Sequence, residues 1–151
     1  MKRIVLPLIF ILMFSACASE TEIAEPDFVL NTEMCIRYAG SEYKAQASTD
    51  NSGELKIKVT EPDTIDGISV VCSENGTEIT CGELSVKSEK GFYVFTKLYK
   101  TLNNAKNSEP ISKENAGETN IFKYNGFSIE TDVSTNRIKK IVTSDCIYEM
   151  R

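Results

Sequence analysis

From Asp27 onward, apolar and polar residues alternate with a period of two along much of the chain. Such alternation predicts strands that bury one face and expose the other to water, as antiparallel sheets do. Glycine, asparagine and proline residues divide the pattern into segments. The predicted strands are residues 30–38, 43–48, 55–59, 68–73, 77–81, 84–87, 120–124, 127–131, 137–143 and 146–150.

Two Asn-Gly pairs, Asn75-Gly76 and Asn125-Gly126, predict tight hairpins between neighbouring strands. A type I′ turn centred on Asn75-Gly76 places Cys72 and Cys81 diagonally on one face. A turn shifted to Gly76-Thr77 places the two cysteines directly opposite each other, where a disulfide fits more easily. The first register matches the apolar residues better, so it favours two unpaired core cysteines.

One segment, residues 91–104, repeats with the period of a helix. Phe92, Phe95 and Tyr99 follow at i, i+3 and i+7 and form an apolar stripe. This stripe is interpreted either as ordinary core packing or as one wall of an apolar ligand cavity. Residues 103–117 are polar and show no periodicity, which favours a mobile loop.

The start of the chain has a different pattern. A basic start precedes an apolar run, residues 4–14. This run is shorter than the roughly 20 residues that cross a bilayer as a helix, but it suits the core of a signal peptide. The run ends in Phe14-Ser15-Ala16-Cys17, which resembles the lipobox of bacterial lipoproteins. That resemblance implies a signal peptide at residues 1–16, a diacylglyceryl group on the Cys17 sulfur, and a membrane anchor on the extracytoplasmic face.

Composition limits the remaining possibilities. Removing residues 1–16 from the 151-residue chain leaves 135 residues and takes away two basic side chains, so the formal charge changes from −5 to −7. This length suits one modest domain, predicted at residues 27–151 after an acidic tether at residues 17–26. The negative charge argues against nucleic acid as a partner and against a polybasic contact with anionic lipid.

The reactive side chains give little sign of catalysis. The chain has no histidine, which removes the commonest general base and most zinc sites. No serine or cysteine lies in a nucleophile-elbow motif, so we expect neither an enzyme nor a bound cofactor. Four cysteines follow Cys17, and they are either disulfide-bonded or buried as small apolar residues. They are Cys35, Cys72, Cys81 and Cys146.

The order of the elements, a strand meander, one helix and a second meander, resembles the LolA-like family of exported proteins, which includes mycobacterial lipoproteins of the LppX type. The resemblance covers residues 27–151 and rests on short features such as Asn75-Gly76, residues 82–86 and residues 92–102. The layout is also similar to that of short lipoproteins of clostridial-type bacteria. The resemblance implies an α+β fold: a strongly curved antiparallel sheet, or half-barrel, with one helix, residues 91–104, on its concave face.

In the family's lipid carriers, the space between sheet and helix holds acyl chains. An anchor at Cys17 would prevent this chain from shuttling between membranes, which favours a stationary binder or sensor of a lipid or other apolar ligand. The alternative is a cell-envelope protein-protein interaction module with a packed core and no ligand. The residues predicted to line an apolar cavity are Val70, Ile79, Phe92, Phe95, Tyr99, Phe127 and Ile129.

Overall fold

The computed structural model describes residues 23–50, 52–88 and 92–151. The predicted signal peptide, Cys17 and the first part of the predicted tether lie outside the described residues. Among the described residues, eleven strands form one antiparallel sheet in the order β6-β5-β4-β3-β2-β1-β11-β10-β9-β8-β7. The strands are β1 Asn31–Tyr38, β2 Ser41–Thr49, β3 Leu55–Glu61, β4 Ser69–Ser73, β5 Gly76–Cys81, β6 Leu84–Ser88, β7 Ser112–Ala116, β8 Thr119–Tyr124, β9 Phe127–Asp132, β10 Ile138–Thr143 and β11 Cys146–Met150.

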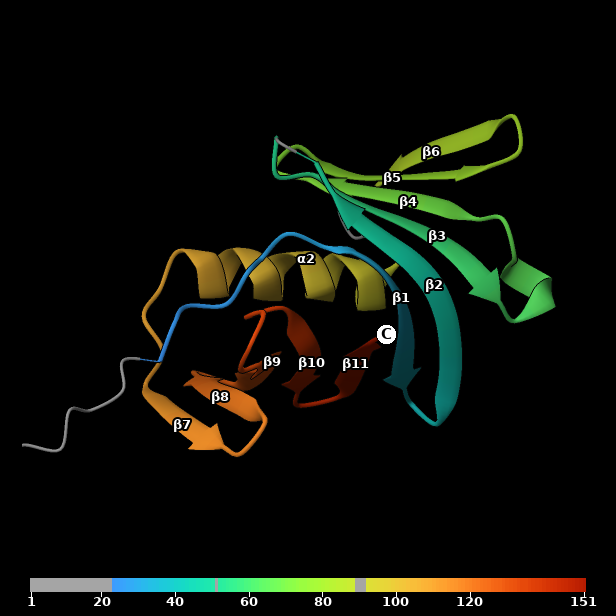
Figure 1. Ribbon diagram of the computed structural model, residues 1–151. Helices are drawn as coiled ribbons and strands as arrows, with labels where there is room; N and C mark the ends of the chain where they lie inside the picture. Colours follow the sequence, from blue (N-terminus) through green and yellow to red (C-terminus); the bar gives the residue numbers. More distant parts are fainter. Residues whose placement is uncertain (1–22, 51, 89–91) are drawn as a thin grey trace, which may run out of the picture.

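The sheet curls around a single described helix, α2 (Tyr93–Lys106), as Figure 1 shows. A short 3-10 turn, η1 (Asp63–Ile65), follows β3. The chain runs outward from β1 to the edge strand β6 and then crosses through α2 to the opposite edge strand, β7. It returns strand by strand to β11, which pairs with β1 in the middle of the sheet. The predicted curved antiparallel half-barrel with one helix is confirmed.

The concave face of the sheet and the apolar stripe of α2 form the core. Cross-strand pairing joins Phe122 to Ile129, Ile129 to Ile141, and Ile141 to Tyr148, so these side chains lie in one row on the concave face. All four are fully buried. The helix buries its own stripe against them. The buried residues of that stripe include Val94, Phe95, Leu98, Tyr99 and Leu102.

The predicted hairpin between β4 and β5 forms, but both predicted registers of strand pairing are wrong. The turn lies at Glu74-Asn75, so Cys72 pairs with Thr77 instead. Gly76 follows the turn with a φ of +119°, a conformation that L side chains rarely adopt. This matches a type I turn followed by a glycine bulge, which takes one more residue than the type I′ turn expected from the dipeptide.

The second predicted hairpin agrees with the structure, because Tyr124 pairs with Phe127 across Asn125-Gly126. The prediction of a mobile loop at residues 103–117 is wrong in part, since this segment contains β7. Most side chains of β7 are polar, as expected of an edge strand that is almost fully exposed. Pairing of its backbone with β8, which hydropathy does not reveal, holds it in place.

All four described cysteines are free. Cys35, Cys72 and Cys146 are buried, as expected of small apolar core residues, whereas Cys81 is exposed.

Candidate functional site

The seven residues predicted to line a cavity all lie on the concave face or on α2 and its first turn, but they differ in exposure. Val70, Phe95, Ile129 and Tyr99 are buried, and Ile79 and Phe127 are partly buried against the core. Phe92 is 38% exposed.

Strand pairing brings some of these residues together and separates others. Val70 pairs directly with Ile79 across β4 and β5. The Phe92 and Phe95 rings meet edge-to-face, with their centroids 5.8 Å apart. Phe127 and Ile129 belong to β9 in the other half of the sheet.

The segment of residues 23–30, here called the strap, crosses α2 on its way to β1 (Figure 1). Ile23 and Phe28 pack against the core. Asp27 donates its backbone N–H to the Asn136 carbonyl at 2.9 Å. Leu30 exchanges hydrogen bonds with Thr49, donating its N–H to the hydroxyl at 3.0 Å and accepting from the Thr49 N–H at 2.9 Å. The strap is therefore fixed to both halves of the sheet.

A cavity of about 300 Å³ lies under the strap, between the C-terminal half of α2 and the β2–β3 turn. We call it the strap cavity. Among its apolar walls are Phe28, Leu55, Tyr99 and Leu102. Charged and amide side chains of Asp27, Asp50, Asn103 and Lys106 also line it. Apolar walls with a few polar groups are typical of a small-molecule site, and the volume lies at the lower end of the usual range of about 300–1,000 Å³.

Tyr99 is the predicted cavity residue that lines the strap cavity, and it also lines a second hollow of about 330 Å³ beside the β4–β5 turn. The second hollow is mostly polar, with Glu74, Asn75, Thr96 and Lys100 in its wall. Sequence reasoning missed Phe28, Leu55 and Leu102 as cavity residues. Their apolar character was visible, but the crossing of the strap over α2 was not.

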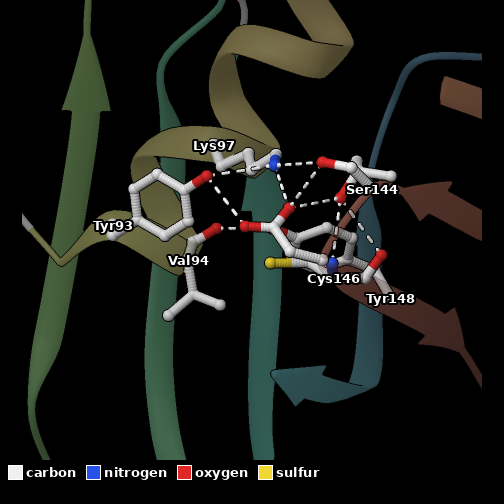
Figure 2. Close-up of polar contacts among 8 residues, drawn as sticks. Tyr93, Val94, Lys97, Ser144, Cys146 and Tyr148 are labelled. Carbon is white, nitrogen blue, oxygen red and sulfur yellow. Dashed lines mark hydrogen bonds and ion pairs between the residues drawn. The ribbon is translucent and has the colours of Figure 1, made fainter. Parts of the chain in front are cut away.

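A polar cluster ties the first turn of α2 to the β10–β11 turn, and its members Tyr93, Lys97 and Ser144 are labelled in Figure 2. The Lys97 ammonium donates to an Asp145 carboxylate oxygen and, at 3.1 Å, to the Tyr93 hydroxyl. The Tyr93 hydroxyl donates to the other Asp145 oxygen at 2.9 Å. Thr143 and Ser144 donate to Asp145 as well, at 3.3 and 3.1 Å.

These contacts fix the charge state of the cluster. Hydrogen bonds from Lys97, Tyr93 and Ser144, opposed by a smaller desolvation effect, lower the pKa of Asp145 to about 2. Burial lowers the pKa of Lys97, but the hydrogen bonds with Asp145 and Tyr93 outweigh that effect and raise the pKa overall. Lys97 therefore stays protonated and Asp145 stays ionised at neutral pH.

The same cluster contains a serine–lysine contact, because the Lys97 ammonium lies 3.4 Å from the Ser144 hydroxyl. Activating a serine in this way requires a neutral lysine that accepts the hydroxyl proton. Lys97 is charged and already donates to Asp145, so it cannot act as that base. The cluster instead fixes the helix to the sheet through the ion pair between Lys97 and Asp145 and the hydrogen bonds around it. We call this ion pair and its hydrogen bonds the latch.

Two buried tyrosines differ in their polar contacts. The Tyr148 hydroxyl donates to the Val94 carbonyl of α2 at 2.7 Å, and burial raises its pKa. The Tyr124 hydroxyl is buried and has no hydrogen-bond partner among the described residues. Its ring instead stacks on Phe127, with the two centroids 4.7 Å apart.

In the part of the chain that the structure describes, no group of three or more histidine, cysteine, aspartate or glutamate side chains is arranged to hold a metal ion. None of the described helices is long and apolar enough to span a bilayer.

Comparison with known proteins gives one structural likeness. A LolA superfamily protein from Nitrosomonas europaea is similar in overall structure, with a TM-score of 0.46, 8% sequence identity, and coverage of 80% of this chain and 81% of that chain. No protein-family model matches this chain. No curated protein sequence matches it significantly.

Proposed function

We propose that this protein is a membrane-anchored extracytoplasmic lipoprotein that binds a lipid chain or another apolar ligand without catalysing a reaction. The observation that carries the proposal is the strap cavity, which has apolar walls from Phe28, Leu55, Tyr99 and Leu102 and lies between the strap, the C-terminal half of α2 and the β2–β3 turn. A volume of about 300 Å³ suits a single short acyl chain or a compact apolar molecule rather than a whole phospholipid.

The proposed anchor would place this cavity near the membrane. Lipidation at Cys17 leaves only a few residues before the strap begins at Ile23. Fully extended, six residues reach about 20 Å, so the strap would lie within about that distance of the lipid headgroups. A ligand dissolved in the membrane would then have a short path to the cavity. The acidic mature chain makes the acyl chains, not surface charge, the source of attachment.

Ligand binding can be tested on the chain from residue 17 onward with Cys17→Ser, purified without detergent. We expect native mass spectrometry to show a co-purified apolar molecule, or a fluorescent fatty acid to bind at a single site. The variant Val29→Trp tests the location, because Val29 lines the strap cavity and is 68% exposed, so a larger side chain can enter the cavity without disturbing the core.

The matched control is Ile111→Trp, which adds the same ring at a position that is 75% exposed, in the segment between α2 and β7. Val29→Trp should weaken probe binding at least several-fold, and Ile111→Trp should leave it unchanged. The proposal fails if neither a co-purified molecule nor probe binding is found, or if both variants bind as the parent chain does.

A second function, an interaction module of the cell envelope, is favoured by a different observation. The edge strand β6 carries two exposed apolar side chains, Leu84 and Val86, which the helix does not cover. Exposed apolar groups beside an unpaired strand edge are typical of protein-binding surfaces.

A further inference from the structure

The two edges of the sheet are protected to different degrees. On β7 every side chain except that of Ala116 is polar or charged, and Lys113 forms an ion pair with Glu25 of the strap. On β6, Leu84 is 74% exposed and Val86 is 61% exposed. Charged residues along an edge strand oppose pairing with another chain unless that chain offers the opposite charge, and exposed apolar residues favour pairing.

The turn before β6 determines which backbone groups of β6 are free. Gly82-Glu83 is a two-residue turn, with Cys81 paired to Leu84. In such a turn the N–H of Leu84 bonds back to the Cys81 carbonyl. Backbone groups alternate in direction along a strand. The N–H and C=O groups of Ser85 and Lys87 therefore point away from β5, toward solvent.

The side chains of β6 also divide into two faces. Val86 pairs with Ile79, and Ile79 pairs with Val70, so Val86 lies on the concave face. Leu84, two residues earlier, lies on the same face. Ser85 and Lys87 lie on the convex face.

We propose that the partner of this edge is a second copy of this chain, joined by antiparallel pairing of β6 with β6 about a two-fold axis at Ser85. This register pairs Ser85 with Ser85 of the other copy through their outward N–H and C=O groups. It places Leu84 of each copy opposite Val86 of the other copy on the concave face. It also brings Glu83, the last residue of the turn, next to Lys87 of the other copy at both ends of the pairing.

Charge complementarity selects this partner and this register. Residues 83–87 are, in order, acidic, apolar, polar, apolar and basic. When two copies of this segment run antiparallel, the acidic residue of each meets the basic residue of the other, and apolar residues meet apolar residues. Opposite charges and apolar residues directly across two strands each stabilise the pair, whereas like charges destabilise it. Centring the axis on Val86 instead would lose both the Glu83–Lys87 and the Leu84–Val86 matches.

Five residues from each chain make a small interface, below the roughly 1,200 Å² of most stable complexes. We therefore expect a reversible dimer that forms readily when both copies are held in one membrane. Confinement raises the effective concentration of each copy, so a weak contact is sufficient. Anchoring at Cys17 is part of the proposed function, but the pairing itself depends neither on the anchor nor on a ligand.

Disulfide trapping of the full chain in its membrane tests the pairing. Ser85→Cys in a Cys81→Ser background brings two thiols together at the axis. Residues in a hydrogen-bonded antiparallel pair have Cα atoms about 5.5 Å apart, within the range of a disulfide. We expect mild oxidation to give a covalent dimer on non-reducing gels. The control is Asn115→Cys in the same background, because Asn115 is exposed in β7 and its N–H also points outward.

Charge reversal tests the register. Glu83→Lys is added to the Ser85→Cys trapping variant, so that residue 83 of each copy carries the same charge as Lys87 of the other copy. This repulsion should reduce the cross-linked fraction by about two- to tenfold. Adding Lys87→Glu to that variant should restore the cross-linked fraction. Neither change touches the strap cavity, so probe binding should be unaffected.

The proposal is overturned if Ser85→Cys and Asn115→Cys cross-link to the same extent, since that would indicate random collision. It is also overturned if Ser85→Cys is trapped only to a different protein, or if charge reversal has no effect. Because binding of an apolar probe is measured separately, failure of the dimer and failure of the proposed function are distinguishable.

Discussion

Two regions of the sheet differ in how far their concave faces are buried, the inner strands β8–β11 and the outer strands β5–β6. In β8–β11, Phe122, Ile129, Ile141 and Tyr148 are fully buried beneath α2. In β5 and β6 the concave face becomes progressively more exposed, from partly buried Ile79 to exposed Val86. The same alternating pattern of residues thus produces core in the inner strands and surface at the β6 edge.

The exposed outer strands follow from size, because the one described helix covers only part of an 11-stranded sheet. Burial of apolar side chains stabilises a fold in proportion to the area removed from water. The inner strands, β8–β11 among them, should therefore supply much of the stability, whereas the outer strands β5 and β6 supply accessible surface. The following changes test that division.

The largest effect is expected for Phe122→Ala. The Phe122 side chain is fully buried, so its removal takes away apolar burial and leaves a cavity. We expect a loss of about 3–5 kcal/mol in the free energy of unfolding, measured by urea denaturation with the slope of the transition unchanged. A loss below about 1 kcal/mol would mean that strands β8–β11 do not belong to the core.

A smaller effect is expected where β11 meets the helix. Tyr148→Phe removes the hydroxyl that bonds to the Val94 carbonyl, and it should cost about 1 kcal/mol. Tyr124→Phe is the matched control, because that hydroxyl is buried without a described partner. Its removal should leave stability unchanged or raise it. Equal losses in the two variants would show that the Tyr148 contact does not stabilise the helix against the sheet.

The third prediction concerns pH. The folded pKa of Asp145 is about 2, below its ordinary value of 3.8, so its contribution to stability is present above pH 3.8 and is lost as the pH falls toward 2. Asp145→Asn should therefore be less stable than the parent chain at pH 6, and the difference should shrink on acidification. The measurement is thermal unfolding across this pH range.

The matched partner for that experiment is Lys97→Met, which removes the other end of the latch. The double variant should lose less than the sum of the two single losses, because both act on one interaction. A difference between Asp145→Asn and the parent chain that stays constant with pH would contradict the latch.

The positions of most strands and of the helix along the chain could be predicted from the sequence because each depends on local periodicity. The stripe at Phe92, Phe95 and Tyr99 was sufficient to place the helix, which begins and ends two residues later than expected. The hairpin register was not predictable in this way. It depended on whether Gly76 lies inside the turn or follows it as a bulge, and the dipeptide fits both arrangements.

The site was harder to predict because it depends on contacts between distant segments. The strap places Phe28 over Tyr99 and Leu102, and no local pattern marks such a crossing. The latch joins Lys97 to Asp145 for the same reason. Tyr99 was predictable as a cavity residue because it belongs to the one apolar stripe on the helix. The strand β7 was missed because an exposed edge strand needs no alternating apolar residues.

The smallest effect is expected at the exposed edge. Leu84→Ala and Val86→Ala should each change the free energy of unfolding of the monomer by no more than about 0.5 kcal/mol, because solvent already reaches both side chains. Their effect should appear in the association of two copies. Because Leu84 of each copy faces Val86 of the other, either substitution weakens both of these apolar contacts in the dimer. Dilute-solution denaturation measures the first quantity, and disulfide trapping at residue 85 measures the second. A large loss of monomer stability from either substitution would show that this edge belongs to the core, and the contrast between strands β8–β11 and the β6 edge would no longer hold.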